Sequence, residues 1–347
     1  MKRLLKRLFR IVMYFIILIL IAVGSFLIWL HLYSYKPATT ENIEINGKGR
    51  EYIFSDTLNI CIWNIGYAGL GKEMDFFYEG GKAVRPDENS MKKYLDGILK
   101  TVKSYDSVEV FLFQEVDTYS KRSYKTDEAK SLASALPEFS SSFAINYQSA
   151  FVPQPLSEPY GKVNSGIMTF SATHPERSVR RAFPPEASFP MQYFMLDRCC
   201  MITTVPIMDG HKLIIVNTHN SAFDDGSKRK EQLNIIRQVL LEEYKKGNYV
   251  IAGGDWNQCP QNYTPTSDYY SLKVEKDFPA IGWTCAFDPS TPSNRNVDKP
   301  YQKGVTKTSV LDFFFLSPNI KLLQVKCSDA GFEFSDHNPV TIKIVLQ

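Results

Sequence analysis

The chain has 347 residues, 44% of them hydrophobic and 13% aromatic, which suits the core of one large α/β domain and excludes a disordered or collagen-like protein. Its net charge of +3 is misleading, because five of its 40 basic residues lie in the first ten positions. The other 35 face 37 acidic residues, a balance of −2, so the rest of the chain lacks the basic field of a nonspecific nucleic-acid binder. Six cysteines without a CxxC pair argue against a zinc site or thioredoxin-like chemistry.

The first 30 residues differ in character from the rest. A basic head from Lys2 to Arg10 precedes 20 uncharged residues, Ile11 to Leu30, enough to cross a hydrocarbon core as a helix. A cleaved signal peptide is the alternative, but the apolar stretch is long and no A-x-A-like site follows it. Because basic residues precede the span and few follow it, we expect a single membrane pass with a cytoplasmic N-terminus. The remainder would then be extracytoplasmic.

Residues 31–57 are expected to form a linker that can hold one short strand. Pro37 breaks any continuation of the preceding helix. A flexible linker of this length spans roughly 30 Å, which would keep residues 58–347 close to the bilayer.

From residue 58 onward, strand and helix patterns alternate. Short apolar runs bounded by polar turns predict strands at 58–63, 108–113, 142–147, 166–171, 199–206, 212–216, 249–252, 311–316 and 340–346. Helical periodicity predicts a helix that begins near Met91 and is capped by Asn89-Ser90, and others at 127–136 and 228–245. Long irregular segments are expected at 66–88, 148–164, 173–197 and 258–309, and loops of that length are usually functional.

Polar residues stand at the ends of these predicted strands. They are Asn64, Gln114-Glu115, His219, Asp255 with Asn257, Asp312, and Asp336-His337. Carboxylate and amide oxygens are the ligands that hard cations such as Mg²⁺ prefer. Asp312 could accept a proton from one ring nitrogen of His337, which would fix the tautomer of the ring and raise its basicity.

Each of these residues also has an ordinary interpretation. Glu115 alone could be an exposed strand end, Asp255-x-Asn257 an Asx turn, and either histidine a structural one. Basic clusters such as Lys121-Arg122 and Arg177 to Arg181 are equally well explained by a solvated face.

Taken in order, seven motifs resemble those of the endonuclease/exonuclease/phosphatase superfamily, the Mg²⁺-dependent phosphoesterase fold of DNase I-like nucleases, inositol polyphosphate 5-phosphatases and neutral sphingomyelinases. The motifs are Trp63-Asn64, Gln114-Glu115, Gly166 to Ser171, Asn217-Thr218-His219, Gly254-Asp255-Trp256-Asn257, Leu311-Asp312-Phe313 and Ser335 to Val340. The resemblance covers about residues 58–347. It implies an α/β (α+β) fold, a four-layer αββα sandwich of two mixed β-sheets with outer helices, preceded here by one N-terminal transmembrane helix. The site would lie where strand ends collect at one edge.

The resemblance also implies a metal centre. Glu115 would be the main metal carboxylate, Asn64 would contact the metal or its water, and Asp336 would be a second carboxylate near it. The metal would be Mg²⁺, with Mn²⁺ as the alternative.

The remaining residues would act on the phosphate and the water. Asp255 would orient the attacking water, and Asn257 and His219 would donate to the nonbridging phosphate oxygens. His337 would be either the general base or the protonated partner of the phosphate, with Asp312 orienting it. Trp256, where a smaller Leu or Phe is commoner in the family, is an apolar departure that leaves this chemistry intact.

The motifs imply hydrolysis of a phosphoester but do not identify the substrate. A membrane tether favours a phospholipid-type diester, whereas an extracytoplasmic endonuclease or exonuclease is the main alternative. An inositol phosphate would need a basic pocket, which Arg177, Arg180, Arg181 and Arg198 could supply. A catalytically degenerate binding module is a further alternative, although such members usually lose the residues that are present here. No protein partner is evident; the membrane is contacted through the N-terminal helix.

Overall fold

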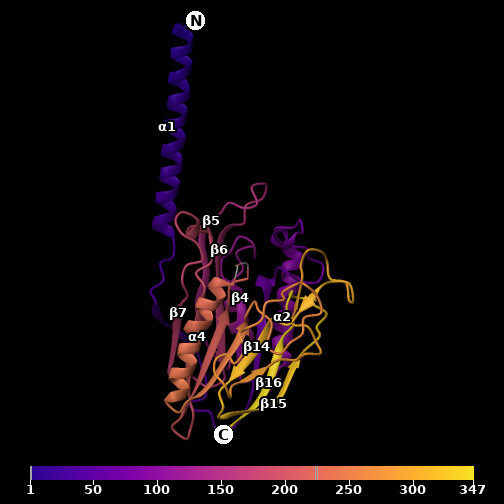
Figure 1. Ribbon diagram of the computed structural model, residues 1–347. Coiled ribbons are helices and arrows are strands. Elements are labelled where there is room, and N and C mark those ends of the chain that lie inside the picture. The colour runs from indigo at the N-terminus through magenta and orange to yellow at the C-terminus, as the bar shows by residue number, and fades with distance from the viewer. Residues whose placement is uncertain (1, 223, 225) are drawn as a thin grey trace.

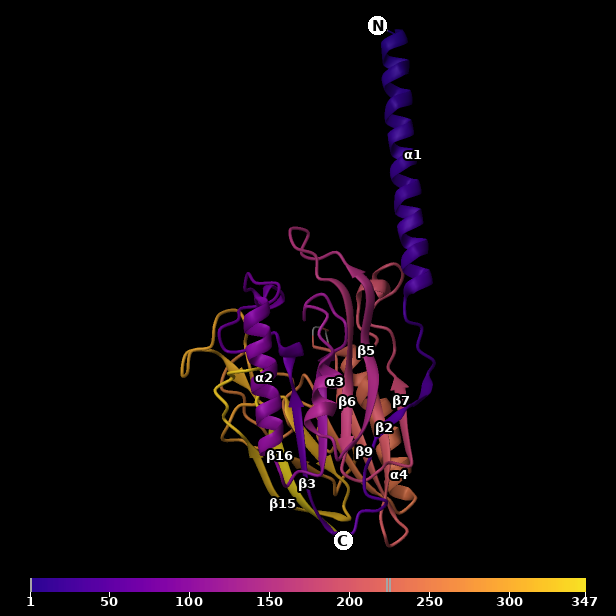
Figure 2. The same ribbon diagram turned by 180° about the vertical axis from the view of Figure 1, so that it is seen from behind.

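The central strands are buried on both faces, which explains the layered architecture. In β3 (Thr57–Asn64), Ile60 and Ile62 belong to one apolar cluster, whereas Cys61 and Trp63 belong to another. Successive side chains of a strand point to opposite faces of its sheet, so such a strand needs an apolar layer on each side. The computed structural model describes residues 2–222, 224 and 226–347, and it places two sheets face to face with helices outside them (Figures 1 and 2).

Each of the two large sheets has seven strands. The first sheet contains, in spatial order, β1 (Thr40–Ile43), β7 (Arg177–Ala182), β8 (Cys199–Pro206), β9 (Lys212–His219), β10 (Tyr249–Asp255), β14 (Asp312–Leu316) and β11 (Thr284–Ala286). The second contains β15 (Ile320–Cys327), β16 (Val340–Leu346), β3, β4 (Val110–Asp117), β6 (Gly161–Ser171), β5 (Ser140–Val152) and β2 (Ile45–Gly47). A separate ribbon pairs β12 (Asn294–Arg295) with β13 (Thr308–Ser309).

The helices cover the outer faces of the sheets. Helices α2 (Glu88–Ser104) and α3 (Glu128–Ala135) pack on the second sheet, and α4 (Ser227–Lys245) packs on the first. Short 3₁₀ helices lie at η1 (Gly66–Ala68), η2 (Phe77–Glu79) and η3 (Met191–Phe194). The expected four-layer sandwich of two mixed sheets is therefore confirmed.

Two parallel strand pairs lie at the centre of the sandwich. Strand β3 pairs with β4 after the crossover through α2, and β9 pairs with β10 after the crossover through α4. The other pairs between the described strands of the two sheets are antiparallel. Because parallel strands end at the same edge, the carboxyl ends of all four central strands meet at one end of the sandwich.

Three expectations about local structure need correction. The cap of α2 is Asp87, whose carboxylate accepts from the backbone of Asn89 and Ser90, so the helix begins earlier than Asn89-Ser90 predicts. The segment 148–164 is irregular only in its middle, because β5 and β6 extend as a hairpin beyond the sheet. The segment 173–197 contains β7, whose charged sequence hides a strand in which Arg180 is fully buried and donates to two backbone carbonyls.

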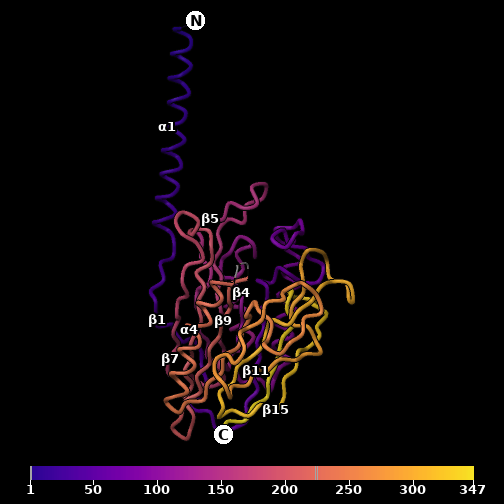
Figure 3. The backbone as a smooth tube through the Cα atoms, in the orientation of Figure 1, coloured from indigo at the N-terminus to yellow at the C-terminus, as the bar shows by residue number. Residues whose placement is uncertain are grey.

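The segment 31–57 contributes more than one short strand. Strand β1 pairs with β7 at the edge of the first sheet, and β2 pairs with β5 at the edge of the second. Ile53 is 5% exposed within the core between the sheets. The backbone trace in Figure 3 follows this connection from α1 (Lys2–Tyr33) down the side of the sandwich. Only about 34–39 separate α1 from the first strand.

Helix α1 extends away from the sandwich, and Leu30 is its one buried residue among those described (Figure 1). By length and composition it is the one helix among the described residues that could cross a membrane.

The pairing of β1 and β2 predicts where the domain can be truncated. A fragment of residues 58–347 loses both edge strands and Ile53, so we expect it to be less stable than residues 38–347 by at least about 2 kcal/mol, the value of burying one large aliphatic side chain. Urea unfolding of the two fragments measures this difference. Equal unfolding midpoints and slopes would show that 38–57 is a linker in the energetic sense.

Candidate active site

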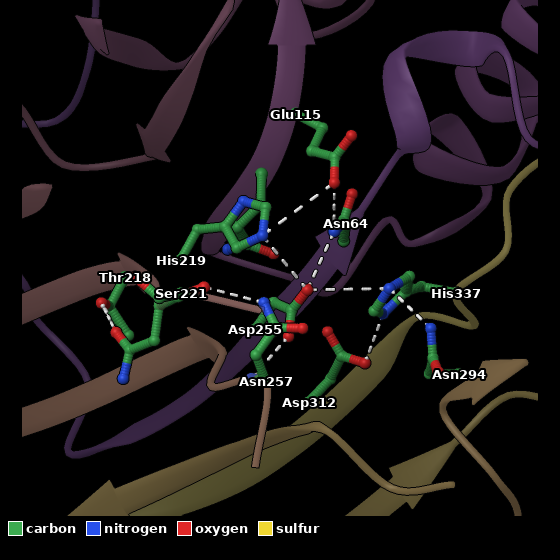
Figure 4. A network of polar contacts seen from close by, with 12 residues as sticks. Asn64, Glu115, Thr218, His219, Ser221, Asp255, Asn257, Asn294, Asp312 and His337 are labelled. Atoms are coloured by element: carbon green, nitrogen blue, oxygen red, sulfur yellow. Dashed lines mark hydrogen bonds and ion pairs between the residues drawn. The ribbon is translucent and has the colours of Figure 1, made fainter. Parts of the chain in front are cut away.

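The candidate site lies where the two parallel strand pairs end (Figure 4). The pairing of β3 with β4 places Asn64 beside Gln114, and the pairing of β9 with β10 places His219 beside Asp255. Antiparallel β14 begins at the same edge, with Asp312 directly opposite Asp255. The turn before β16 reaches this edge because β16 is antiparallel to β3. Residues that are far apart in the sequence are thus brought together by strand register.

Two buried hydrogen bonds connect the sheets beneath the site. Asn64 Nδ2 in the second sheet donates to Asp255 Oδ2 in the first at 3.0 Å. Gln114 Nε2 in the second sheet donates to Asn217 Oδ1 in the first at 2.8 Å. Since buried amides lose free energy when they are left unpaired, these bonds fix the position of one sheet against the other.

Asp255 is the centre of the polar cluster. It is 2% exposed, and its Oδ2 lies 3.5 Å from His219 Nε2 and 3.6 Å from His337 Nε2. Burial raises the pKa of Asp255 to about 6; the charge of Asp312 also raises it, while His337 and the hydrogen bonds from Asn257 and Asn64 oppose the rise. The side chain can therefore accept a proton near neutral pH.

His337 is held from both sides of its ring. Its Nδ1 lies 2.7 Å from Asp312 Oδ2, and its Nε2 lies 2.9 Å from Asn294 Nδ2. Asn294 Oδ1 is buried without a hydrogen-bond partner among the described residues. A half-turn of the amide would aim this oxygen at Nε2, which is the arrangement that a doubly protonated ring requires.

The two histidines of the site differ in charge. Burial lowers the pKa of His337, but the negative charges of Asp312, Asp255 and Asp336 outweigh burial and hold it well above its usual value. Burial and the charges of Arg198 and His337 hold the pKa of His219 well below its usual value. The site therefore combines an imidazolium with a neutral imidazole, a pairing typical of divided acid and base roles.

Glu115 and Asp336 form an oxygen-rich corner that fits a hard cation. Glu115 lies at an irregularity in the β4–β6 register, with a left-handed φ of 55°, and its Oε1 accepts from Asn64 Nδ2 at 3.2 Å. Burial and the nearby charge of Glu115 raise the pKa of Asp336 to about 6, against the lowering effect of His337. Two carboxylates with incomplete compensation are the donor set that Mg²⁺ or Mn²⁺ takes in proteins.

Asn64 is placed differently from the role that the family resemblance implies. Its Oδ1 accepts from the backbone of Gly66 at 3.0 Å, and its Nδ2 donates to both Glu115 and Asp255. In this arrangement Asn64 orients carboxylates and offers no oxygen to a metal. Its amide would have to turn before it could be a ligand.

A second group could surround a cation by distance alone. One ligand atom each from Asp255, Asp312 and His337 lies within 4.8 Å of the others, and all three residues are buried. We assign this group to proton handling, because the short contact between Asp312 Oδ2 and His337 Nδ1 already occupies both atoms. The corner at Glu115 has no such internal partner apart from Asn64 and His219 in the described contacts.

Asn257 lies at the wall of the site, but its amide is engaged. It adopts a left-handed φ of 50° after Asp255, whose Oδ1 accepts from its backbone N–H, and its Nδ2 donates to Asn220 O at 2.8 Å. Gly254 makes this turn possible, because a Cβ there would lie 2.0 Å from Thr218 O. One N–H of the Asn257 amide remains for a ligand.

These residues line a cavity of about 290 Å³ with many aromatic rings. Tyr67, Phe76, Tyr78, Tyr147, Tyr160 and Tyr270 contribute to its walls. Arg122 also lines it, with its guanidinium 3.7 Å from the centre of the Tyr67 ring and paired with Asp117 at 2.7 Å. The interpretation of Lys121-Arg122 as a solvated face is therefore wrong for Arg122, which is 6% exposed.

The sequence gave no signal for several other residues of the cavity. Asn294, Glu79 and Arg198 come from segments that we expected to be irregular, and their sequence neighbours show no strand or helix pattern that would single them out. Long irregular segments near a site were the one available hint. Arg198 donates to Glu186 and to His219 O, so it supports the cavity wall.

The layers, the strand order and the polar edge define a DNase I-like phosphoesterase fold, and the chain belongs to the endonuclease/exonuclease/phosphatase family, whose model matches residues 61–337. Members of this family are hydrolases that act on phosphoester bonds, generally with divalent metal ions. A comparison with curated proteins finds no match.

Solved structures share the fold at low sequence identity. An endonuclease/exonuclease/phosphatase from Beutenbergia cavernae is 18% identical, with a TM-score of 0.61 over 84% of this chain and 72% of that one. The catalytic domain of human Nocturnin with a bound sulfate anion is 18% identical, with a TM-score of 0.52 over 88% and 98%. TDP2 from Caenorhabditis elegans is 15% identical, with a TM-score of 0.50 over 83% and 74%.

The contact between Asp312 and His337 predicts the effect of Asp312→Asn. The amide keeps the shape of the carboxylate but removes its charge, so the pKa of His337 should fall by about 1–3 pH units. A pH titration of the ring nitrogens by NMR of histidine-labelled, metal-free protein measures it. Asp209→Asn is the matched control, because Asp209 pairs with His211 on the surface at 3.2 Å. An unchanged His337 titration in Asp312→Asn would contradict the assignment.

Proposed function

We propose that the protein is a membrane-anchored, metal-dependent phosphoesterase that hydrolyses a phosphodiester or phosphomonoester by in-line attack of water. The observation that carries the proposal is the convergence of Glu115, Asp255, His219 and the Asp312–His337 pair on one cavity. Phosphoryl transfer requires a positioned water and positive or hydrogen-bonding groups around the phosphate oxygens, and this set supplies both.

Asp255 and His337 divide the proton handling in this proposal. Asp255 orients the attacking water and accepts its proton as the new bond to phosphorus forms. His337, as the protonated partner of the phosphate, donates from Nε2 to a phosphate oxygen, and Asp312 holds the opposite ring nitrogen. The raised proton affinity of His337 favours this role over that of the general base, which was the other role left open.

His219 and Asn257 would bind the nonbridging phosphate oxygens. His219 Nε2 faces the carboxylates of Asp255 and Glu115 at 3.5 and 3.9 Å, so this nitrogen carries the hydrogen of the neutral ring. A phosphate held between these residues would receive that hydrogen and the free N–H of Asn257.

Glu115 and Asp336 would hold the divalent cation, Mg²⁺ with Mn²⁺ as the alternative, and Asn64 would hold Glu115 in place. A bound cation would neutralise charge on the phosphate oxygens. The residues of the chain provide the orientation around it.

A phospholipid-type diester or a nucleic acid is the proposed substrate class. The aromatic walls suit an apolar or stacking group beside the phosphate. An inositol phosphate is disfavoured, because Arg177, Arg180 and Arg181 lie in β7 with partners of their own and do not line the cavity. Arg198 is the one member of that arginine group that does.

The apolar helix α1 supports membrane anchoring. Its 20 uncharged residues from Ile11 to Leu30 follow five basic residues, a pattern that retains the N-terminus in the cytoplasm. We therefore propose that residues 31–347 lie outside the cytoplasmic membrane.

The catalytic proposal predicts Mg²⁺-dependent hydrolysis of bis-p-nitrophenyl phosphate by the full chain in detergent. EDTA should abolish turnover, and His337→Ala should lower kcat/KM by at least about 100-fold, because proton donation in the transition state is lost. His211→Ala, a histidine on the surface, is the matched control. Absence of turnover on this diester, plasmid DNA, sphingomyelin vesicles and an inositol polyphosphate alike would favour the binding-module alternative.

The topology proposal predicts the activity of a reporter fused after residue 38, between α1 and β1. Alkaline phosphatase folds only outside the cytoplasm, so this fusion should be active in bacteria, and a cytoplasmic reporter at the same point should be inactive. The opposite pattern would place the catalytic domain inside.

A further inference from the structure

The end of α1 is packed against the wall of the catalytic cavity. Leu30 is fully buried, and His31 Nδ1 is hydrogen-bonded to Tyr193 OH at 2.9 Å. One turn earlier in the helix, the ring of Phe26 meets the ring of Phe151 edge-on, with 6.4 Å between the centroids. Phe151 lies near the end of β5, and Tyr193 lies in η3. The helix is therefore held at two points on one end of the sandwich.

These contacts set the depth of the domain relative to a bilayer. The uncharged span ends at Leu30, so Phe26 lies about 6 Å inside that end at 1.5 Å per residue. A ring that touches Phe26 must lie at a similar depth. The end of β5 therefore reaches the level of the outer acyl chains whenever α1 crosses the membrane.

The chain segments at that level are suited to a lipid surface. There is no charged residue from 139 to 157 or from 187 to 196. Within them Leu156, Phe189 and Met191 are 87%, 62% and 50% exposed, which is costly in water and favourable in the interface. Figures 1 and 2 show the β5–β6 hairpin loop rising on the same side as α1.

The same segments form part of the cavity wall. Phe194, Met195 and Leu196 line the cavity directly after η3. Tyr147 OH donates to Phe194 O at 3.0 Å, and Ser149 Oγ donates to Tyr193 O at 2.8 Å, so β5 and η3 form one unit. The unit that contacts α1 is thus continuous with the rim of the site.

We propose that this unit, defined as 151–157 and 187–193, inserts into the outer leaflet of the bilayer that α1 crosses, so that the rim of the catalytic cavity rests on lipid. The inference depends on the membrane anchor of the proposed function and is independent of the proposed chemistry. The committed occupant is the lipid surface, because the anchor brings it to this face and no other.

The test measures the depth of single residues in the full chain, reconstituted in phosphatidylcholine nanodiscs. An NBD fluorophore is attached to Leu156→Cys, to Leu20→Cys within α1, or to Ile281→Cys, each in a Cys285→Ser background. The other five cysteines are buried. Ile281 is the matched control, since it is 86% exposed and precedes β11, which pairs with β14 at the end of the sheet opposite Asp312. Emission wavelength and quenching by lipids with brominated acyl chains are recorded.

The expected result is a shift to shorter wavelength, with quenching by brominated lipid, at positions 20 and 156 but not at 281. A shift at 20 without one at 156 would overturn the inference and leave the anchor intact. No shift at 20 would overturn the anchor and the inference with it. Hydrolysis of bis-p-nitrophenyl phosphate by the same samples reports on the proposed chemistry separately, so the two failures are distinguishable.

Discussion

The structure depends on two amide bridges that cross between the sheets, Asn64 to Asp255 and Gln114 to Asn217. The space between the sheets is otherwise filled by aliphatic side chains such as Ile62, Ile251 and Leu112, whose packing is strong but tolerates sliding. A buried amide tolerates no such displacement, because it would lose its partner and gain no water. The bridges therefore fix the register between the layers, and with it the distances in the site.

That register explains why one buried carboxylate can serve several neighbours. Asp255 comes from the first sheet, its amide partner from the second, and His337 from the turn before the last strand. Burial makes the charge of Asp255 costly, and His337 offsets part of that cost by remaining protonated. The charges of the site are therefore mutually dependent, and a metal at Glu115 and Asp336 would act on an already coupled set.

The position of α1 gives the catalytic edge a direction. The polar strand ends, the β5–β6 hairpin and η3 all lie toward the end of the sandwich to which the helix is attached (Figure 1). Among the named substrate classes, this arrangement is most economical for one that is itself at the membrane. An extracytoplasmic nuclease would gain from the tether only retention at the cell surface.

Much of the fold was predictable, because it depends on local periodicity. The strand ending in Asn64, the strand before Glu115 and the helix over 228–245 follow from apolar spacing, and the order of motifs led to the family. Prediction failed where burial did not follow hydrophobicity. Strand β7 carries arginines, of which Arg180 is buried because backbone carbonyls satisfy it, and the hairpin beyond 147 is held by pairing and not by a core.

The sequence by itself determined which residues could do chemistry and at which strand ends they stand, since these depend on residue type and on short-range pattern. The tertiary structure alone decided their partners. Asn294 meets His337 across 43 residues, Asn64 meets Asp255 across 191, and Tyr193 meets His31 across 162. Such contacts depend on strand register and on the packing of one sheet against another, and no local pattern encodes them.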